Sequence, residues 1–212
     1  MTQTGIFNGR TRVRYGYARY GYTRGGGKTW HGGIDLEALD DATIRMPFYN
    51  GKRISGKVVT ARRVTNTSNK TWEWGWYVCV KLDANQTPDK VNYLYFCHCE
   101  KLLVKVGQKV SSGDALAVMG NSGNAAQANP PYKHCHFEVR ATATGTGLDP
   151  TAYAGCDNAV GTYGSNDGDK PAAAKLQTIT IGPVSQGDAD AIKALCDARG
   201  LTKQGLYSSK WA

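Results

Sequence analysis

Short runs of alternating hydrophobic and polar residues follow one another through the middle of the chain. The alternation is clearest at residues 56–61, 76–82, 91–99, 115–119 and 134–140, and turn residues separate the runs. A period of two residues is typical of a strand with one buried face, and no stretch between residues 43 and 139 sustains a helical period. The pattern therefore predicts a mainly β domain with an antiparallel β-sheet core.

The pattern changes near residue 156. Residues 156–173 lose the alternation and gather Gly, Asn, Asp, Pro and Ala, which is typical of a linker. Beyond them, residues 177–184 alternate like a strand, residues 188–199 have the spacing of a helix, and residues 207–209 suit a last short strand. We therefore divide the chain into a β domain at 1–155, a linker at 156–173 and a small α/β unit of βαβ type at 174–212.

Charge and hydropathy limit the possible partners. The formal net charge is +9, and residues 1–30 hold six basic residues and no acidic one. Such a surface favours anionic partners, but no nucleic-acid motif is present, so nucleic acid is not expected. No apolar run approaches the roughly 18 residues of a transmembrane segment. The first ten residues also lack the charged and apolar segments of a signal peptide, so we expect the protein to be made without one.

Two of the four histidines, His134 and His136, lie two residues apart in a predicted strand. Side chains two apart on a strand project from the same face, about 6.6 Å apart along the chain. Both imidazoles can therefore reach one small site, as metal ligands or catalytic groups. Two surface histidines would give the same pattern.

A second motif, His31-Gly32-Gly33-Ile34-Asp35, adds two residue types that commonly bind zinc. On a straight strand, His31 and Asp35 would lie about 13 Å apart, too far to share one ion. The two glycines permit a bend that brings them together. An ordinary glycine turn is the alternative, and a packed core histidine is the alternative for His98, which lies in an apolar strand. If these histidines formed no site, all of these separate alternatives would have to be true at once. The combined motifs therefore favour a metal or catalytic site.

Three of the six cysteines lie beside these histidines. Cys97 and Cys99 flank His98, and Cys135 lies between His134 and His136. Strand alternation predicts that the three thiols face away from the imidazoles, as small buried groups and not as zinc ligands. No CxxC pair is present, and we expect reduced thiols.

The order of the motifs resembles that of the lysostaphin-type zinc metallopeptidases, also called the LytM-like family. The resemblance covers roughly residues 25–155. Each motif alone is weak, but the ordered set is specific. It comprises H-x-x-x-D at 31–35, Phe96-Cys97-His98, a V-x-x-G-x-x-V hairpin at 104–113, G-N-S-G-N at 120–124, H-C-H-F-E-V at 134–139 and L-D-P at 148–150.

The resemblance implies a zinc ion (Zn2+) held by His31, Asp35 and His136, with His134 and His98 as unligated catalytic imidazoles. It implies an antiparallel β-sheet core with groove-forming loops. The implied activity is zinc-dependent hydrolysis of peptide cross-links or stem peptides in bacterial peptidoglycan, with anionic wall polymers as further partners. Without a signal peptide, a phage or prophage lysin, released by lysis or carried on the phage particle, is the expected setting.

This chain departs from the family at several positions. Tyr132-Lys133 stands where Gly-Pro is common, and Cys97, Cys99 and Cys135 replace Ala or Leu. These changes bear on substrate preference and remove no implied ligand. The alternative, a non-catalytic wall-binding or activator module with this fold, is disfavoured because the ligand set is complete. A cupin-like metal domain is disfavoured because its HxH motif normally precedes its other histidine ligand, whereas here HxH is the last histidine motif in the chain. A biotinyl or lipoyl carrier domain, which shares the V-x-x-G-x-x-V pattern, is disfavoured because its lysine motif is missing here.

The C-terminal unit resembles, weakly, half of a sporulation-related peptidoglycan-binding domain. That resemblance implies that residues 174–212 hold the enzyme on the wall. One helix over one small sheet makes a poor core. We therefore expect the unit to pair its sheet edge with a second copy, giving a homodimer, or with the β domain.

Overall fold

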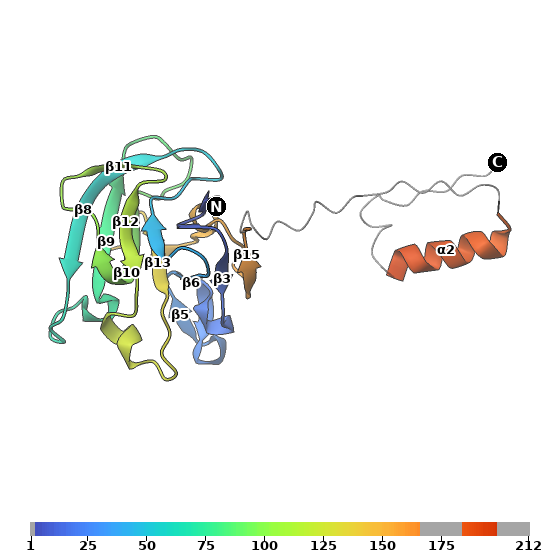
Figure 1. Cartoon of the computed structure of the whole chain (residues 1–212), viewed down its shortest axis with the longest axis horizontal. Coiled ribbons are helices and arrows are strands. Elements are labelled where there is room, and N and C mark those ends of the chain that lie inside the picture. The colour runs from blue at the N-terminus through green and yellow to red at the C-terminus, as the bar shows by residue number, and fades with distance from the viewer. Residues whose placement is uncertain (1–2, 166–183, 199–212) are drawn as a thin grey trace. The chain divides into compact units, whose positions relative to one another are not determined.

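The computed structural model describes residues 3–165 and 184–198. The chain divides between Lys170 and Pro171 into two units. Figure 1 shows the strands of the first unit and the helix α2 of the second.

One large sheet dominates residues 3–165, and its neighbouring strands are antiparallel (Figure 1). The strand order is β11-β8-β9-β10-β13-β6-β3-β15, with β12, β7 and β14 attached beside this path. The predicted mainly β, antiparallel fold is confirmed. The strands are β3 (Thr11–Val13), β6 (Ile34–Ala38), β7 (Thr43–Arg45), β8 (Ser55–Arg63), β9 (Trp76–Leu82), β10 (Tyr93–Leu102), β11 (Lys109–Ser111), β12 (Ala115–Met119), β13 (Cys135–Arg140), β14 (Gly147–Leu148) and β15 (Gly161–Tyr163).

Smaller elements connect and flank this sheet. Two further hairpins pair β1 (Gln3–Thr4) with β2 (Phe7–Asn8) and β4 (Gly21–Arg24) with β5 (Thr29–His31). The helical turns within residues 3–165 are η1 (Gly16–Ala18), η2 (Gly25–Gly27), η3 (Trp72–Trp74), η4 (Gly123–Gln127) and α1 (Thr151–Ala154). The β4–β5 hairpin and the η3 and η4 turns carry residues of the site described below.

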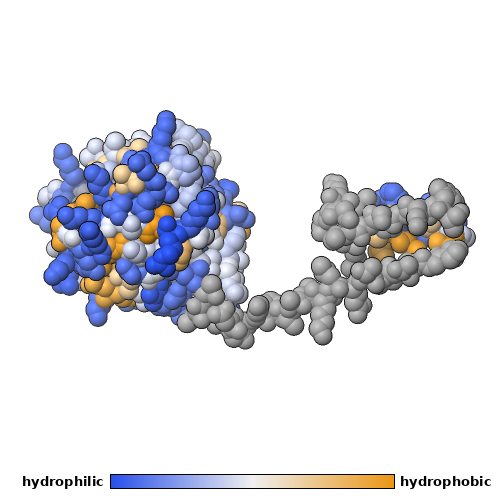
Figure 2. Space-filling view, turned by 90° about the horizontal axis from the view of Figure 1, so that it is seen from above, coloured by the Kyte–Doolittle hydropathy of each residue, from blue (hydrophilic) through white to orange (hydrophobic). Residues whose placement is uncertain are grey.

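Strand alternation gives the sheet two apolar faces. Leu94 and Phe96 of β10 belong to the main core, whereas Tyr95 and Cys97 belong to a smaller cluster. In the main core, the rings of Phe96 and Phe137 stack with centroids 5.2 Å apart, joining β10 to β13. The exposed side of the domain is mostly polar, with smaller apolar patches visible in Figure 2.

The alternation breaks at His98, whose φ of 62° is rare for a residue other than glycine. β10 pairs with β13 up to Phe96 and with β12 from Cys99 onward, so the strand changes one partner at this bulge. Cys97 consequently packs in the smaller cluster, and Cys99 packs in the main core. The prediction that both thiols lie on one face was therefore wrong. All six cysteines lie in the described part of the chain and are free, and Cys97, Cys99 and Cys135 are buried.

The β domain continues past residue 155, so residues 156–165 are not a linker as predicted. β15 pairs with β3 at the end of the sheet, and Cys156 is buried in the main core. The Asn158 side chain also accepts a hydrogen bond from the Tyr20 backbone N–H at 2.8 Å. The sequence pattern did not predict the strand in this segment because backbone groups form its pairing with β3, and a Gly- and Asn-rich composition does not reveal such pairing.

The second unit contains the helix α2 (Gln186–Ala198), at the position where the sequence predicts a helix. It starts two residues earlier than predicted because Ser185 caps it: the Ser185 hydroxyl oxygen accepts from the Asp188 N–H at 3.2 Å. The predicted strands at 177–184 and 207–209 fall almost wholly outside the described residues. Within the described residues, no helix is long and apolar enough to cross a membrane.

Candidate metal centre and active site

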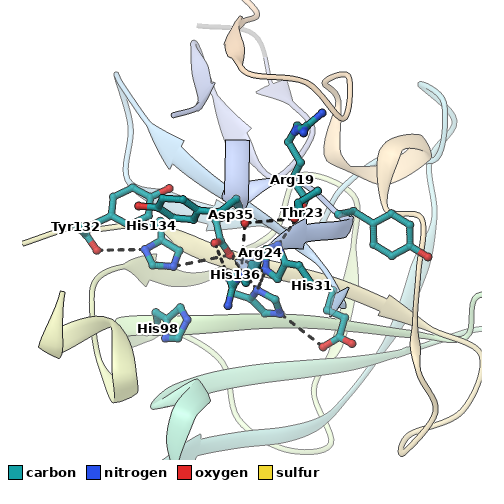
Figure 3. Close-up of polar contacts among 12 residues, drawn as sticks. Arg19, Thr23, Arg24, His31, Asp35, His98, Tyr132, His134 and His136 are labelled. Carbon is teal, nitrogen blue, oxygen red and sulfur yellow. Dashed lines mark hydrogen bonds and ion pairs between the residues drawn. The ribbon is translucent and has the colours of Figure 1, made fainter. Parts of the chain in front are cut away.

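Three strands bring His31, Asp35 and His136 together. His31 ends β5, Asp35 lies in β6, and His136 in β13 is the direct cross-strand partner of Asp35. His31 Nε2 lies 3.0 Å from His136 Nδ1 and 3.2 Å from Asp35 Oδ1, and the last two atoms are 2.9 Å apart. Figure 3 shows the three side chains converging.

This triangle fits a small metal ion bound by nitrogen and oxygen. Zinc binds such ligands at about 2.0–2.1 Å, which puts the ligand atoms of a tetrahedral site about 3.3 Å apart. The observed distances of 2.9–3.2 Å come close to that value. No cysteine joins the set within the described residues. Three protein ligands leave one position for water or substrate, as in catalytic sites.

Gly33 permits this convergence mainly because it lacks a side chain. A Cβ at Gly33 would lie 2.4 Å from the Phe137 carbonyl oxygen and 2.9 Å from His136 Cε1. The chain does bend between β5 and β6, as predicted. However, neither Gly32 nor Gly33 has a positive φ, so close approach to β13, rather than an unusual backbone angle, requires glycine.

Outer polar contacts select the nitrogen that each ligand histidine offers. His31 Nδ1 donates to the Arg19 carbonyl oxygen at 2.8 Å, which leaves the Nε2 lone pair toward the site. His136 presents Nδ1 to the site, while its Nε2 lies 3.6 Å from Glu138 Oε2. Glu138 is buried and is held in turn by two hydrogen bonds from Arg140, at 2.8 and 2.9 Å.

Electrostatics keep the central carboxylate ionised. Burial alone would raise the pKa of Asp35, but the hydrogen bond from His136 and the neighbouring imidazoles outweigh burial and hold that pKa well below its ordinary value. Burial likewise acts to lower the pKa of His136, yet its contacts with Asp35 and Glu138 raise the pKa to about 9. A metal ion binding to Nδ1 would replace the proton held there.

His98 and His134 lie beside the ligand triangle, with ring centroids 4.8 Å apart. Each donates its Nδ1–H to a backbone carbonyl: His98 to Ser122 at 2.9 Å and His134 to Tyr132 at 3.1 Å. Burial lowers both pKa values, that of His98 to about 3. Both rings are therefore neutral near pH 7 and keep an unprotonated Nε2, and that of His134 lies 3.8 Å from Asp35 Oδ1.

A groove of about 520 Å³ opens over these residues. Asp35, His98, His134 and His136 line it, so two of the three candidate ligands share one accessible space with the neutral imidazoles. The remaining wall includes aromatic, polar and charged side chains from η1, the β4–β5 hairpin, η3 and η4, among them Tyr17, Arg24, Glu73, Trp74 and Asn124.

The structure brings together all five residues singled out in the sequence and adds three that sequence reasoning missed. Arg24 donates to Asp35 Oδ2 and to His31 Nε2. Arg140 positions Glu138 and lies over the Trp74 ring at 5.0 Å. Tyr132 stacks on His134 with centroids 4.2 Å apart. Only Tyr132 had a signal in the sequence, as a departure from the usual Gly-Pro.

A three-ligand His/Asp/His set that leaves a position open belongs to the class of candidate catalytic metal centres. The chain itself belongs to peptidase family M23, whose family model matches residues 29–150. The resemblance inferred from the motifs is thereby confirmed. All five of the singled-out residues lie within this match.

Several solved structures are similar to this chain. The catalytic domain of lysostaphin from Staphylococcus simulans is 22% identical, covers 70% of this chain and 94% of its own, and has a TM-score of 0.47. A variant catalytic domain of the prophage-encoded M23 protein EnpA from Enterococcus faecalis is 22% identical, with coverage of 67% and 91% and a TM-score of 0.48. A zinc-containing peptidase from Vibrio cholerae is 22% identical, with coverage of 68% and 35% and a TM-score of 0.39.

Proposed function

We propose that this M23 peptidase is a zinc-dependent endopeptidase that cuts peptide bonds in bacterial peptidoglycan. The observation that carries the proposal is that the ligand triangle lies beside two neutral imidazoles, and that Asp35, His136 and both of these imidazoles line one groove. A binding module would need the groove but not this chemistry. The complete set therefore favours an enzyme over the non-catalytic alternative.

His31, Asp35 and His136 would hold the zinc ion through Nε2, Oδ1 and Nδ1. Zinc bound there supplies Lewis-acid chemistry, which polarises a carbonyl group and lowers the pKa of water. The hydrogen bond from His31 to the Arg19 carbonyl and the ion-pair contact of His136 with Glu138 orient the two ligand imidazoles and so direct their lone pairs toward the site.

His134 is proposed as the general base. Its Nε2 is unprotonated near pH 7 and faces Asp35, so it can take the proton of an attacking water. His98 Nε2, which is also unprotonated, is proposed to accept a hydrogen bond from that water and so to orient it. The backbone carbonyls that accept from Nδ1 prevent either ring from presenting its other nitrogen.

Variants of these residues test the assignment by separating metal content from catalysis. His134→Ala and His98→Ala should keep zinc, measured by elemental analysis, and lose about 10²–10⁴-fold in peptide cleavage. Asp35→Ala should lose both. Lys57→Ala is the control, because its side chain is exposed on β8 and does not line the groove. Full zinc content in Asp35→Ala would contradict the ligand set.

The biological setting stays a prediction from the sequence. A phage or prophage lysin remains the proposed source, and wall anchoring remains the proposed role of residues 174–212. Peptidoglycan is proposed as substrate because the chain belongs to peptidase family M23 and because the candidate site lines a groove of about 520 Å³.

A further inference from the structure

Arg24, the last residue of β4, contacts the candidate metal centre without belonging to the ligand set. Its Nη2 donates to Asp35 Oδ2 at 2.9 Å and to His31 Nε2 at 2.9 Å. One guanidinium thus touches two of the three ligand residues, as Figure 3 shows. Because a guanidinium stays charged at all working pH values, this contact is a permanent positive charge beside the centre.

The contact of Arg24 with Asp35 is compatible with metal binding, whereas its contact with His31 is not. Asp35 turns Oδ1 toward the two ligand imidazoles and Oδ2 toward Arg24, so the ion pair with Arg24 leaves the ligand oxygen available. His31 has only one lone pair on its ring. Its Nδ1 carries the proton donated to the Arg19 carbonyl, and its Nε2 lone pair accepts from Arg24. That lone pair cannot serve Arg24 and a metal ion together.

We propose that Arg24 is a built-in competitor of the metal ion. In the metal-free protein its guanidinium neutralises the buried Asp35 carboxylate and holds the His31 lone pair. Zinc binding then requires Nη2 to withdraw from His31. The proposal rests on the zinc site proposed above, and it makes Arg24 a determinant of metal affinity rather than a ligand or a catalytic residue.

The surroundings of Arg24 permit such a withdrawal. Its side chain is 41% exposed and lines the groove. Its contact outside the ligand set is weak, an Nε–H directed at the Tyr17 carbonyl oxygen at 3.4 Å. The backbone turns immediately after it through Gly25, Gly26 and Gly27, all with positive φ, and no neighbour lies within 4 Å of a Cβ built on Gly26. The Arg24 side chain, exposed and at the groove, therefore has room to swing away from His31.

The size of the effect follows from the population of the competing contact. If the Arg24–His31 contact is present in about nine-tenths of metal-free molecules, the apparent zinc affinity is lowered about tenfold. A residue that merely positions Asp35 would act in the opposite direction. Loss of an outer partner of that kind weakens metal binding, typically by about 10–100-fold. The sign of the change therefore separates the two roles.

The test measures zinc affinity of the full chain by competition with a chromophoric chelator. Arg24→Met, and independently Arg24→Gln, should bind Zn2+ about tenfold more tightly than the unmodified protein. Their metal-free forms should have a lower Tm, because Asp35 loses one of its two cationic partners and keeps only His136, so zinc should raise Tm further in the variants. Arg12→Met is the matched control, since Arg12 pairs with the buried Glu37 instead of a ligand residue, and its zinc affinity should not change.

Equal or weaker zinc binding by both Arg24 variants would overturn the competitor role. If the unmodified protein and all variants failed to bind zinc while folded, this proposal and the proposed zinc site would fall together. Equal binding by all of them would overturn only the role of Arg24. The same competition with Co2+ gives an optical readout of the site and should show the same order of affinities.

Discussion

Replacing Gly33 with Ala perturbs the metal centre without changing any residue that would touch the metal. The added methyl carbon would lie 2.4 Å from the Phe137 carbonyl oxygen and 3.0 Å from His136 Nε2, whereas ordinary contact begins near 3.4 Å. Relieving the first overlap takes a shift of about 1 Å. Because Phe137 pairs with Ile34 across the strands, β13 must move away from β6, or the bend must open.

Both movements cost stability and spread the ligand triangle. Overpacking of this size costs about 1–3 kcal/mol, partly offset by about 0.4–1 kcal/mol because alanine restricts the unfolded chain more than glycine. A net loss of about 1–2 kcal/mol corresponds to a Tm lower by about 2–8 °C in a domain of this size. Displacing His136 should also weaken zinc binding by about 10–100-fold, the range typical of misplaced ligands.

The assay pairs thermal unfolding with chelator competition for Zn2+. Gly16→Ala serves as the control, because no atom lies within 4 Å of a Cβ built there and its φ is not positive. Its stability should stay within about 0.5 kcal/mol of the original protein. A Gly33→Ala protein with unchanged Tm and unchanged zinc affinity would refute the argument that close approach requires glycine at this position.

Three further predictions follow from other residues. The Tyr132 hydroxyl is buried without a hydrogen-bond partner among the described residues. Tyr132→Phe should therefore leave the free energy of unfolding unchanged or raise it by up to about 1 kcal/mol. A loss above about 2 kcal/mol, measured by denaturant titration, would count against this. Burial lowers the pKa of His98 from 6.5 to about 3, so the unfolded chain takes up this proton first as pH falls. Stability should therefore drop below pH 6.5 by up to about 1.4 kcal/mol per pH unit from this group, and His98→Gln should make the decline between pH 6.5 and 5 shallower. A chain ending at residue 165 keeps β15 and should cleave a soluble peptide normally while binding intact walls more weakly, and equal wall pull-down would exclude targeting by the removed residues.

The strands were predictable because alternation records which side chains face the core. Residues 76–82 and 115–119 match β9 and β12 residue for residue. The bulge at His98 was not predictable, since its φ of 62° arises where β10 changes its partner, a relation between distant segments. β15 was missed for a related reason: its pairing with β3 depends on backbone hydrogen bonds, which composition does not reveal.

The candidate site was likewise predictable only in part from the sequence. Motif order pointed to the five histidine and aspartate positions, because ligand chemistry limits the residue types that can serve. The residues around them were not predictable. Arg24 reaches the site through the register of the β4–β5 hairpin, where Gly21 pairs with His31, and Arg140 acts through Glu138. Gly33 was singled out for a bend, whereas the structure shows that the space beside β13 is what demands it.

The measurement that tests the central proposal most directly is a digestion of purified peptidoglycan followed by mass spectrometry of the released fragments. The zinc-loaded protein should create new peptide amino termini, a chelator should abolish them, and added Zn2+ should restore them. His134→Ala, still loaded with zinc, should release almost none. Intact wall peptides after treatment with folded, zinc-loaded protein, across walls with different cross-bridges, would contradict the proposal.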